Sequence, residues 1–178
     1  MMPGARAPCV LGVLRGALAV ACIGASASKD DPVATLRAKH LRLPLDTAKV
    51  DAMKGQFSEV HGGHAHEAVD LLAPRMTPIH AVEDGTIAKL FLSRDGGNTI
   101  YQFDPTKRFC YYYAQLEKYA KGLEEAQAVK RGDVIGYVGT SGNAPPNTPH
   151  LHFTIFELDS SARWWKGTPI DPYDVYRY

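Results

Sequence analysis

The sequence predicts a single, mainly β domain whose strands form an antiparallel sheet, with few short helices. A chain of 178 residues is short enough for one domain and long enough to bury a core. Apolar residues make up 45% of the chain and charged residues 22%, which are ordinary values for a globular protein. From residue 69 onward, short apolar runs alternate with glycine, proline, asparagine and aspartate, a pattern typical of strands and turns.

The N-terminal segment, residues 1–27, has the organisation of a secretory signal peptide. Two arginines are its only charged residues, and an apolar run over 16–25 precedes a small-residue triplet that ends at Ala27. The run is about half the length needed to span a bilayer. We therefore expect export with cleavage after Ala27 and no transmembrane span in the mature chain. The alternative interpretation is an imperfect lipobox, in which Cys22 carries a lipid anchor.

The remaining chain divides into a polar N-terminal arm, residues 28–49, and a domain expected to span residues 50–178. The arm has one weakly periodic apolar patch. In the domain, β-branched and aromatic residues are concentrated in short runs bounded by turn residues. Only residues 116–125 have a pattern compatible with a turn or two of helix. Strands are expected over residues 86–92, 98–103, 109–113, 134–138 and 151–156.

Charge and cysteine content exclude several classes of protein. Twenty Lys and Arg against 19 Asp and Glu give a net charge of +1, so no basic surplus indicates nucleic-acid binding. The three cysteines include no CxxC pair, which argues against a thiolate zinc site. Without the leader, Cys110 is the only cysteine and cannot form an internal disulfide, so we expect a buried thiol.

Histidine placement is the clearest chemical signal in the chain. Five of the seven histidines fall in two short segments. Residues two apart in a strand point to the same face with Cα atoms roughly 6.5 Å apart. One histidine of such a pair can bind a metal while the other lies beside the coordination position that no protein ligand occupies. The five are His61, His64, His66, His150 and His152.

A metal site can be assembled from both segments. His66 and Asp70 are four residues apart and can converge on one ion with His152 if a turn precedes the strand at residue 69. Three nitrogen and oxygen ligands leave the fourth tetrahedral position for water, which is the pattern of a catalytic zinc site. His61 and His64 are either auxiliary ligands or substrate contacts, or exposed residues of a glycine-rich loop.

These residues resemble the signature of the M23 family of zinc metallopeptidases, the lysostaphin-like or LytM domain. The family's H-x-x-x-D and H-x-H segments are found here at residues 66–70 and 150–152. The resemblance covers about 100 residues in the family's order, which makes it far more specific than an isolated H-x-H. It continues through residues 73–87, 96–98, 113–116, 129–139 and 149–153.

The resemblance implies a twisted antiparallel sheet with one zinc ion per chain in a surface groove, and hydrolysis of peptide cross-links in bacterial peptidoglycan. His66, Asp70 and His152 match the family's zinc ligands. His150 matches a catalytic histidine that acts on the attacking water. The implied partner is the peptide stem of peptidoglycan, not nucleic acid, and the implied location is the periplasm or cell envelope.

One position departs from the family pattern. Where the family usually has the histidine of a Tyr-x-His-Leu segment, this chain has Gln115. Glutamine cannot shuttle a proton, but its amide NH₂ can donate a hydrogen bond to a developing oxyanion. Two interpretations stay open: an endopeptidase with reduced turnover, or a non-catalytic LytM-like module that regulates cell-wall amidases. The complete ligand set with His150 beside it favours the enzyme.

Two further departures concern loop shape. The family commonly has glycine where this chain has Met76, and often has glycine where it has Ala126. Both replacements are expected to affect the backbone of a turn more than the chemistry of the site.

Overall fold

The computed structural model describes residues 1, 31–61 and 63–177, so the expected leader lies outside the described residues. Within this part of the chain, strands predominate and the helices are short. The helical segments are α1 (Pro32–Ala38), η1 (Val50–Met53), η2 (Gln56–Ser58) and α2 (Pro172–Tyr176). The strands are β1 (Val60–His61), β2 (His64–Ala65), β3 (Val69–Leu72), β4 (Pro78–His80), β5 (Gly85–Ser93), β6 (Gly97–Phe103), β7 (Phe109–Tyr119), β8 (Ala128–Val129), β9 (Val134–Val138), β10 (His150–Leu158) and β11 (Gly167–Ile170).

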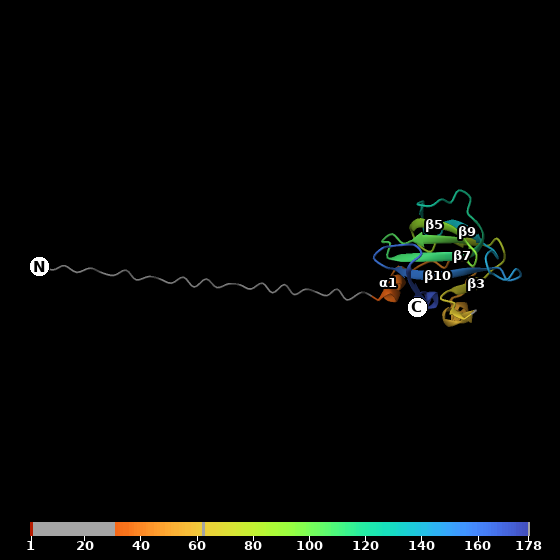
Figure 1. Ribbon diagram of the computed structural model, residues 1–178, viewed down its shortest axis with the longest axis horizontal. Helices are drawn as coiled ribbons and strands as arrows, with labels where there is room; N and C mark the ends of the chain where they lie inside the picture. Colours follow the sequence, from red (N-terminus) through yellow and green to blue (C-terminus); the bar gives the residue numbers. More distant parts are fainter. Residues whose placement is uncertain (2–30, 62, 178) are drawn as a thin grey trace.

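Nine of the described strands form one antiparallel sheet, which confirms the predicted fold class. Its main path runs β11-β10-β7-β6-β5-β8, and β3 pairs with β10 on the side that β11 also occupies. Figure 1 shows β5, β7, β10 and β3 following one another across the body of the molecule. Each of the five expected strand segments lies within an observed strand.

The core lies on one face of this sheet. Alternation along β7 sends Tyr111 and Tyr113 into it, and both side chains are fully buried, while Tyr112 faces the other way and is half-buried. Cys110 is buried as expected, and burial raises the pKa of its thiol far above the ordinary range. The cysteine is therefore a small buried residue without nucleophilic character.

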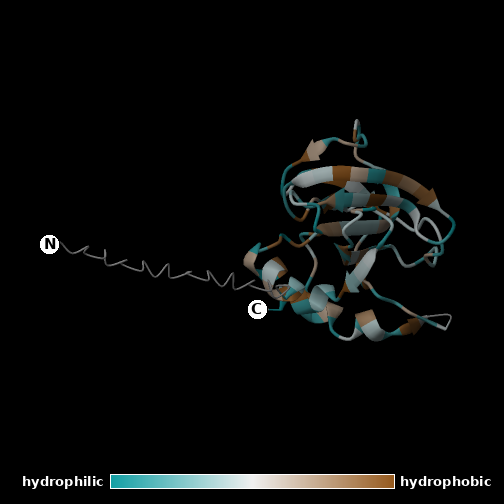
Figure 2. Cartoon of the chain, turned by 60° about the vertical axis from the view of Figure 1, so that its left-hand side comes forward, coloured by the Kyte–Doolittle hydropathy of each residue, from teal (hydrophilic) through white to brown (hydrophobic). Residues whose placement is uncertain are grey.

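The N-terminal arm packs onto the domain. Pro32 opens α1 and the Asp31 carboxylate caps it by accepting from the Val33 backbone N–H at 3.0 Å, a favourable start for a short helix. Leu36 and Leu45 of the arm are fully buried in the same core as the sheet residues. Figure 2 shows the short helices gathered on the side of the sheet where β3 lies, away from β5. No helix among the described residues is long and apolar enough to cross a membrane.

The expectation of a helical turn over residues 116–125 is wrong. Leu116 is fully buried and pairs with Val138 of β9, and Lys118 pairs with Tyr137, so β7 continues to Tyr119. The segment after Tyr119 forms turns. Strand pairing with a distant segment outweighs the local helical preference here, and a local pattern carries no information about that pairing.

The two loop departures both adopt left-handed backbone conformations. Met76 has φ of 70° and Ala126 has φ of 64°. Side chains other than glycine seldom adopt this region, because Cβ approaches the following carbonyl oxygen. The turns therefore keep a shape suited to glycine although the chain has other residues there.

A close approach between two loops makes Gly142 a sensitive position. A Cβ on Gly142, which has φ of 73°, would lie 2.2 Å from the Asp95 carbonyl oxygen. We expect Gly142→Ala to lower the free energy of unfolding by about 2–5 kcal/mol, the sum of left-handed strain and overpacking. Urea denaturation checks this, with Gly122→Ala as the matched control. Gly122 also has positive φ but open space around it, so only the strain of about 1–2 kcal/mol is expected. Equal losses in the two variants would contradict the packing argument.

Candidate metal centre and active site

The pairing of β10 with β3 brings two predicted site residues together from 82 positions apart. His152 lies directly opposite Asp70 in the antiparallel register. Opposed residues in such a pair project from the same face with Cβ atoms about 4.5–5.5 Å apart. The Nδ1 atom of His152 accordingly lies 3.0 Å from Oδ1 of Asp70.

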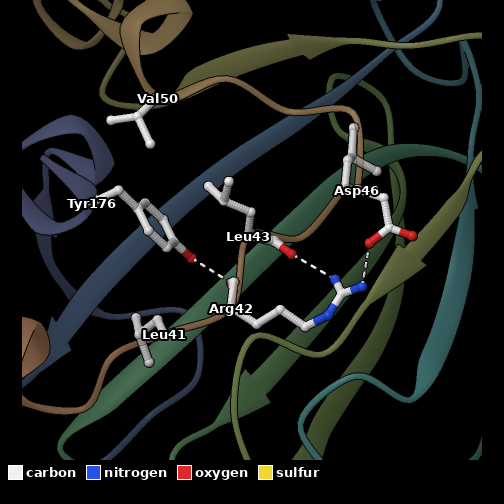
Figure 3. Close-up of a pocket in the computed structure, with 7 residues that line it drawn as sticks. Leu41, Arg42, Leu43, Asp46, Val50 and Tyr176 are labelled. Atoms are coloured by element: carbon white, nitrogen blue, oxygen red, sulfur yellow. Dashed lines mark hydrogen bonds and ion pairs between the residues drawn. The ribbon is translucent and has the colours of Figure 1, made fainter.

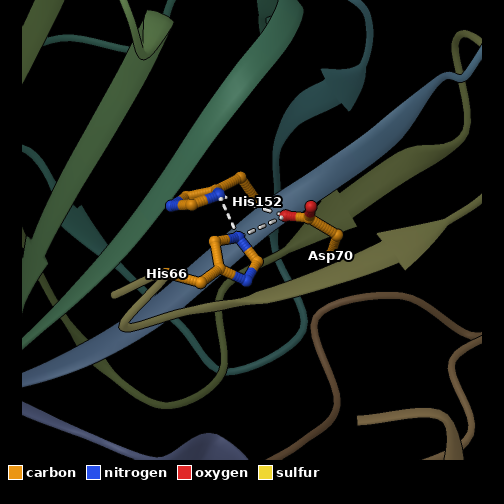
Figure 4. A group of neighbouring side chains, drawn as sticks. All are labelled: His66, Asp70 and His152. Carbon is orange, nitrogen blue, oxygen red and sulfur yellow. Dashed lines mark hydrogen bonds and ion pairs between the residues drawn. The ribbon is translucent and has the colours of Figure 1, made fainter. Parts of the chain in front are cut away.

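The third predicted ligand, His66, comes from the loop that enters β3. Its backbone N–H donates to the Glu59 carbonyl oxygen at 2.8 Å, which fixes the loop beside the start of the sheet. Its Nε2 atom lies 3.2 Å from Oδ1 of Asp70 and 3.2 Å from Nδ1 of His152. Figure 4 shows the three side chains pointing toward one another.

The three converging atoms have the chemistry of a metal site. The Nδ1–H of His66 donates to the Gln56 carbonyl oxygen at 3.2 Å, so the neutral ring presents the lone pair of Nε2 to the cluster. The Asp70 carboxylate has only lone pairs, and such atoms repel at these distances unless a proton or a cation lies between them. A tetrahedron with Zn–N bonds of about 2.1 Å has edges of about 3.4 Å. The donor set and its spacing therefore fit a zinc ion, and the three residues could hold one.

The electrostatics of the cluster agree with this donor set. Burial of Asp70 raises the pKa of its carboxyl group, but the hydrogen bonds with His152 and His66 outweigh burial and hold that pKa well below its usual range. The contact with Asp70 raises the pKa of His66 although burial opposes the charge. Both directions follow from the same geometry, in which one carboxylate oxygen lies 3.0–3.2 Å from two ring nitrogens.

His150 lies beside the cluster without belonging to it. The residue is 5% exposed, and its Nε2 is 3.7 Å from Oδ1 of Asp70. Its Nδ1 lies 2.7 Å from the Thr148 carbonyl oxygen and donates to it, so a neutral ring presents the Nε2 lone pair to the pocket. His150 and His152 share one face, as their spacing predicts, and His150 is placed to exchange a proton with a group bound in front of it.

Gln115 faces the same pocket because of its backbone conformation. Ala114 pairs with His152, and regular alternation would send the next side chain to the opposite face. Gln115 instead has φ of 62°, and its N–H leaves the ladder to donate to the Gly96 carbonyl oxygen at 2.7 Å. An irregularity of this kind re-aims a side chain next to a functional site.

The Gln115 side chain is held by one partner. Gln115 is only 7% exposed, and its Nε2 donates to Oδ1 of Asn143 at 2.8 Å. The Oε1 atom has no hydrogen-bond partner among the described residues. A buried acceptor without a partner is costly in a folded protein.

All five predicted site residues line one pocket of about 300 Å³. Two apolar side chains, Ala144 and Pro145, complete its wall. The lining residues are His66, Asp70, Gln115, Asn143, Ala144, Pro145, His150 and His152.

The other histidines of the first segment are not part of the described cluster. His64 is exposed in β2, and the side chain of His61 lies outside what the structure describes. A larger pocket of about 460 Å³ lies between the arm and α2, away from the cluster. Its arginine, Arg42, donates to the Leu43 carbonyl oxygen at 2.7 Å and pairs with Asp46, as Figure 3 shows. The Arg42 guanidinium is thus bound by residues of the arm itself, and the residues that line this pocket do not include the proposed metal ligands.

Sequence reasoning missed two residues that shape the site. Asn143 follows a glycine in a segment readable only as a turn, and its contact with Gln115 depends on how that turn packs against β7. Gln56 lies shortly before the histidine-rich segment that begins at His61, where no motif marks it. It contacts both His66 and Asp70.

Comparison with known proteins places the chain in a family. The sequence model of peptidase family M23 matches residues 64–172, more than half of the chain. The L-Ala–D-Glu endopeptidase of Bacillus subtilis is 33% identical over 121 residues, which cover 65% of this chain and 36% of that protein. The DD-carboxypeptidase/endopeptidase Mpg of Neisseria meningitidis is 31% identical over 127 residues, covering 65% of this chain and 24% of that protein. The chain thus spans about a third or less of these relatives.

Solved structures agree with the sequence comparison. The catalytic domain of the antimicrobial peptidase lysostaphin from Staphylococcus simulans superposes with a TM-score of 0.57 and 25% identity. The match covers 74% of this chain and 99% of that domain. The residues that the family model matches include His66, Asp70 and His152. The chain therefore belongs to peptidase family M23.

Proposed function

We propose that the chain is a zinc-dependent metalloendopeptidase that hydrolyses peptide cross-links in bacterial peptidoglycan. The observation that carries the proposal is the convergence of His66, Asp70 and His152, whose lone pairs meet at 3.0–3.2 Å beside the unligated His150. Such a donor set leaves one position of a tetrahedral ion open, as catalytic zinc sites do.

The proposed zinc site uses Nε2 of His66, Oδ1 of Asp70 and Nδ1 of His152, with one ion per chain. When bound, zinc supplies Lewis-acid polarisation of the scissile carbonyl and makes water a better nucleophile near neutral pH. The Gln56 carbonyl oxygen fixes the His66 tautomer by accepting a hydrogen bond from Nδ1–H. The register of β3 against β10 fixes the other two ligands.

His150 is proposed as the general base and then the general acid. Its Nδ1 keeps its proton and donates it as a hydrogen bond to the Thr148 carbonyl oxygen, so Nε2 is the atom that takes a proton from the water that attacks the carbonyl carbon. As the C–N bond breaks, the same Nε2 delivers that proton to the leaving amine. The immediate products are a carboxylic acid, which keeps the second water hydrogen, and an amine; near neutral pH the acid gives up that proton and the amine gains one.

Gln115 is proposed to orient the substrate without exchanging protons. One Nε2 hydrogen is committed to Asn143, which leaves the second hydrogen as a donor. This hydrogen can approach a developing oxyanion. Such a contact moves no proton, so we expect activity that is present but reduced.

The names of the curated relatives support the substrate class. They include an L-Ala–D-Glu endopeptidase, a DD-carboxypeptidase/endopeptidase and a peptidoglycan DD-endopeptidase of Vibrio cholerae. The proposed location is the cell envelope, outside the cytoplasm, where such a substrate lies. Export through residues 1–27 and lipidation at Cys22 stay predictions from the sequence. The regulatory module is not favoured, because such a module has no chemical need for His150 beside three ligands.

Digestion of isolated peptidoglycan tests the proposed function. The purified chain is incubated with sacculi, and soluble muropeptides are identified by mass and by new α-amino groups. Chelator-sensitive release of fragments cut at amide bonds supports the endopeptidase. Absence of release by the parent chain, together with clear release by Gln115→His, would favour the regulatory module instead.

We expect Gln115→His to raise the rate of muropeptide release by up to about 100-fold, because it adds a titratable group to the pocket. Histidine is among the residues that tolerate a left-handed backbone, so the turn can be kept. Gln115→Met serves as the matched control because it fills similar space without polar atoms, and it is expected to fall below the parent. Equal initial rates for all three proteins would show that this position has no influence on turnover.

A further inference from the structure

One residue outside the part matched by the family model contacts two of the three proposed ligands. Gln56 opens η2, in the segment that crosses the free side of β3. β3 pairs only with β10 among the described strands, so its other side lacks a strand partner. Gln56 occupies that side next to the pocket.

The main chain of Gln56 contacts His66. Its carbonyl oxygen lies 3.2 Å from Nδ1 of the His66 ring and also accepts the Glu59 backbone N–H at 3.1 Å. Because the imidazole donates at Nδ1, only Nε2 keeps a lone pair for a metal. This contact sets both the tautomer and the orientation of the ring.

The side chain of Gln56 contacts Asp70. Its Oε1 accepts the Asp70 backbone N–H at 2.6 Å, and its Nε2 lies 3.4 Å from the Asp70 carbonyl oxygen. The same Nε2 donates to the Ala52 carbonyl oxygen at 2.5 Å, which anchors the amide to η1. The amide thus takes the place of a neighbouring strand at the single residue of β3 that faces the metal cluster.

We infer that Gln56 is a positioning residue for zinc, acting on His66 through its carbonyl oxygen and on Asp70 through its amide. The inference rests on the proposed function in that it takes zinc as the resident ion. Partners that orient metal ligands in this way typically contribute 10–100-fold to metal affinity. Substitution of Gln56 removes the contact of its side-chain amide with Asp70. The contact of its backbone carbonyl oxygen with His66 remains in every variant.

The test measures zinc affinity and ligand geometry independently of hydrolysis. Zinc dissociation constants are obtained by competition with a chromophoric chelator, and the cobalt-substituted proteins are compared by their visible absorption spectra. We expect Gln56→Met to weaken zinc binding about 10–100-fold and to alter the cobalt spectrum. Gln56→Glu keeps an acceptor for the Asp70 N–H and should recover part of the loss.

Gln102→Met is the matched control for a purely structural role. The Gln102 amide is fully buried, donates to the Glu83 carbonyl oxygen at 2.8 Å and accepts from the Tyr113 hydroxyl at 2.8 Å. It lies outside the metal pocket, so its loss should lower the melting temperature with zinc affinity unchanged. If Gln56→Met melts below the assay temperature, Gln56→Asn replaces it as the test variant. Asparagine is one methylene shorter, so its amide is drawn away from the Asp70 backbone while the side chain stays polar.

Two results would overturn the inference. One is parental zinc affinity and an unchanged cobalt spectrum in Gln56→Met, or in Gln56→Asn where that variant replaces it. The other is an equal loss of affinity in Gln102→Met, which would assign the effect to general destabilisation. A parent chain that binds no zinc would instead contradict the proposed function itself, so the two failures are distinguishable.

Discussion

Replacing His152 with alanine is expected to abolish peptidoglycan hydrolysis and to weaken zinc binding by more than about 100-fold. The side chain supplies one of three proposed donors and lies opposite Asp70 in the sheet, so its loss removes a ligand and also a charge partner of the carboxylate. Loss of a ligand should exceed the 10–100-fold effect typical of groups that only orient ligands. Muropeptide release and zinc competition measure the two effects.

His64→Ala provides the matched control for this prediction. His64 belongs to the same histidine-rich segment as His66 but is exposed and absent from the cluster. The control should keep parental activity and zinc affinity. Zinc should raise the melting temperature of the parent and of the control but not that of His152→Ala, since only binding to the folded state stabilises it. Hydrolysis retained by His152→Ala would contradict the assignment of this residue.

Replacing His150 with alanine is expected to lower turnover by about 10²–10⁴-fold while zinc stays bound. The Nε2 atom is 3.7 Å from Asp70 Oδ1 and is oriented by the Thr148 carbonyl oxygen, so it can serve the reaction without serving as a ligand. Initial rates of muropeptide release give the loss, and metal analysis of the same sample gives the zinc content.

The separation of these two effects distinguishes His150 from His152. His150→Gln keeps hydrogen-bonding groups and similar bulk but cannot exchange a proton. It should be nearly as slow as His150→Ala and should bind zinc as the parent does. A His150 variant that loses zinc in parallel with activity would make this residue a ligand and would contradict the proposed division of roles.

Most of the fold could be predicted because its strands are marked by local composition. Runs such as residues 134–138 and 151–156 are bounded by turn residues and rich in β-branched and aromatic side chains, which fit a pleated surface. The prediction of a helical turn over residues 116–125 is wrong, because β7 is extended by pairing with β9. Leu36 belongs to the weakly periodic apolar patch of the arm and enters the core, as does Leu45, which lies outside that patch.

The candidate site was predictable where spacing alone fixes geometry. Two-residue spacing places His150 and His152 on one face, and the family pattern supplied their connection to His66 and Asp70. The position of Gln115 depends on a left-handed residue inside a strand, which regular alternation would contradict. Gln56 reaches the site only because η2 lies along β3, and tertiary placement of that kind leaves no motif in the sequence.

Titration of the metal-free chain with zinc, followed by the rate of muropeptide release, tests the central claim most directly. The account predicts no release without metal, a linear rise as zinc is added, and a plateau at one zinc ion per chain. Release by the metal-free chain, or no release after one equivalent of zinc has bound, would contradict it.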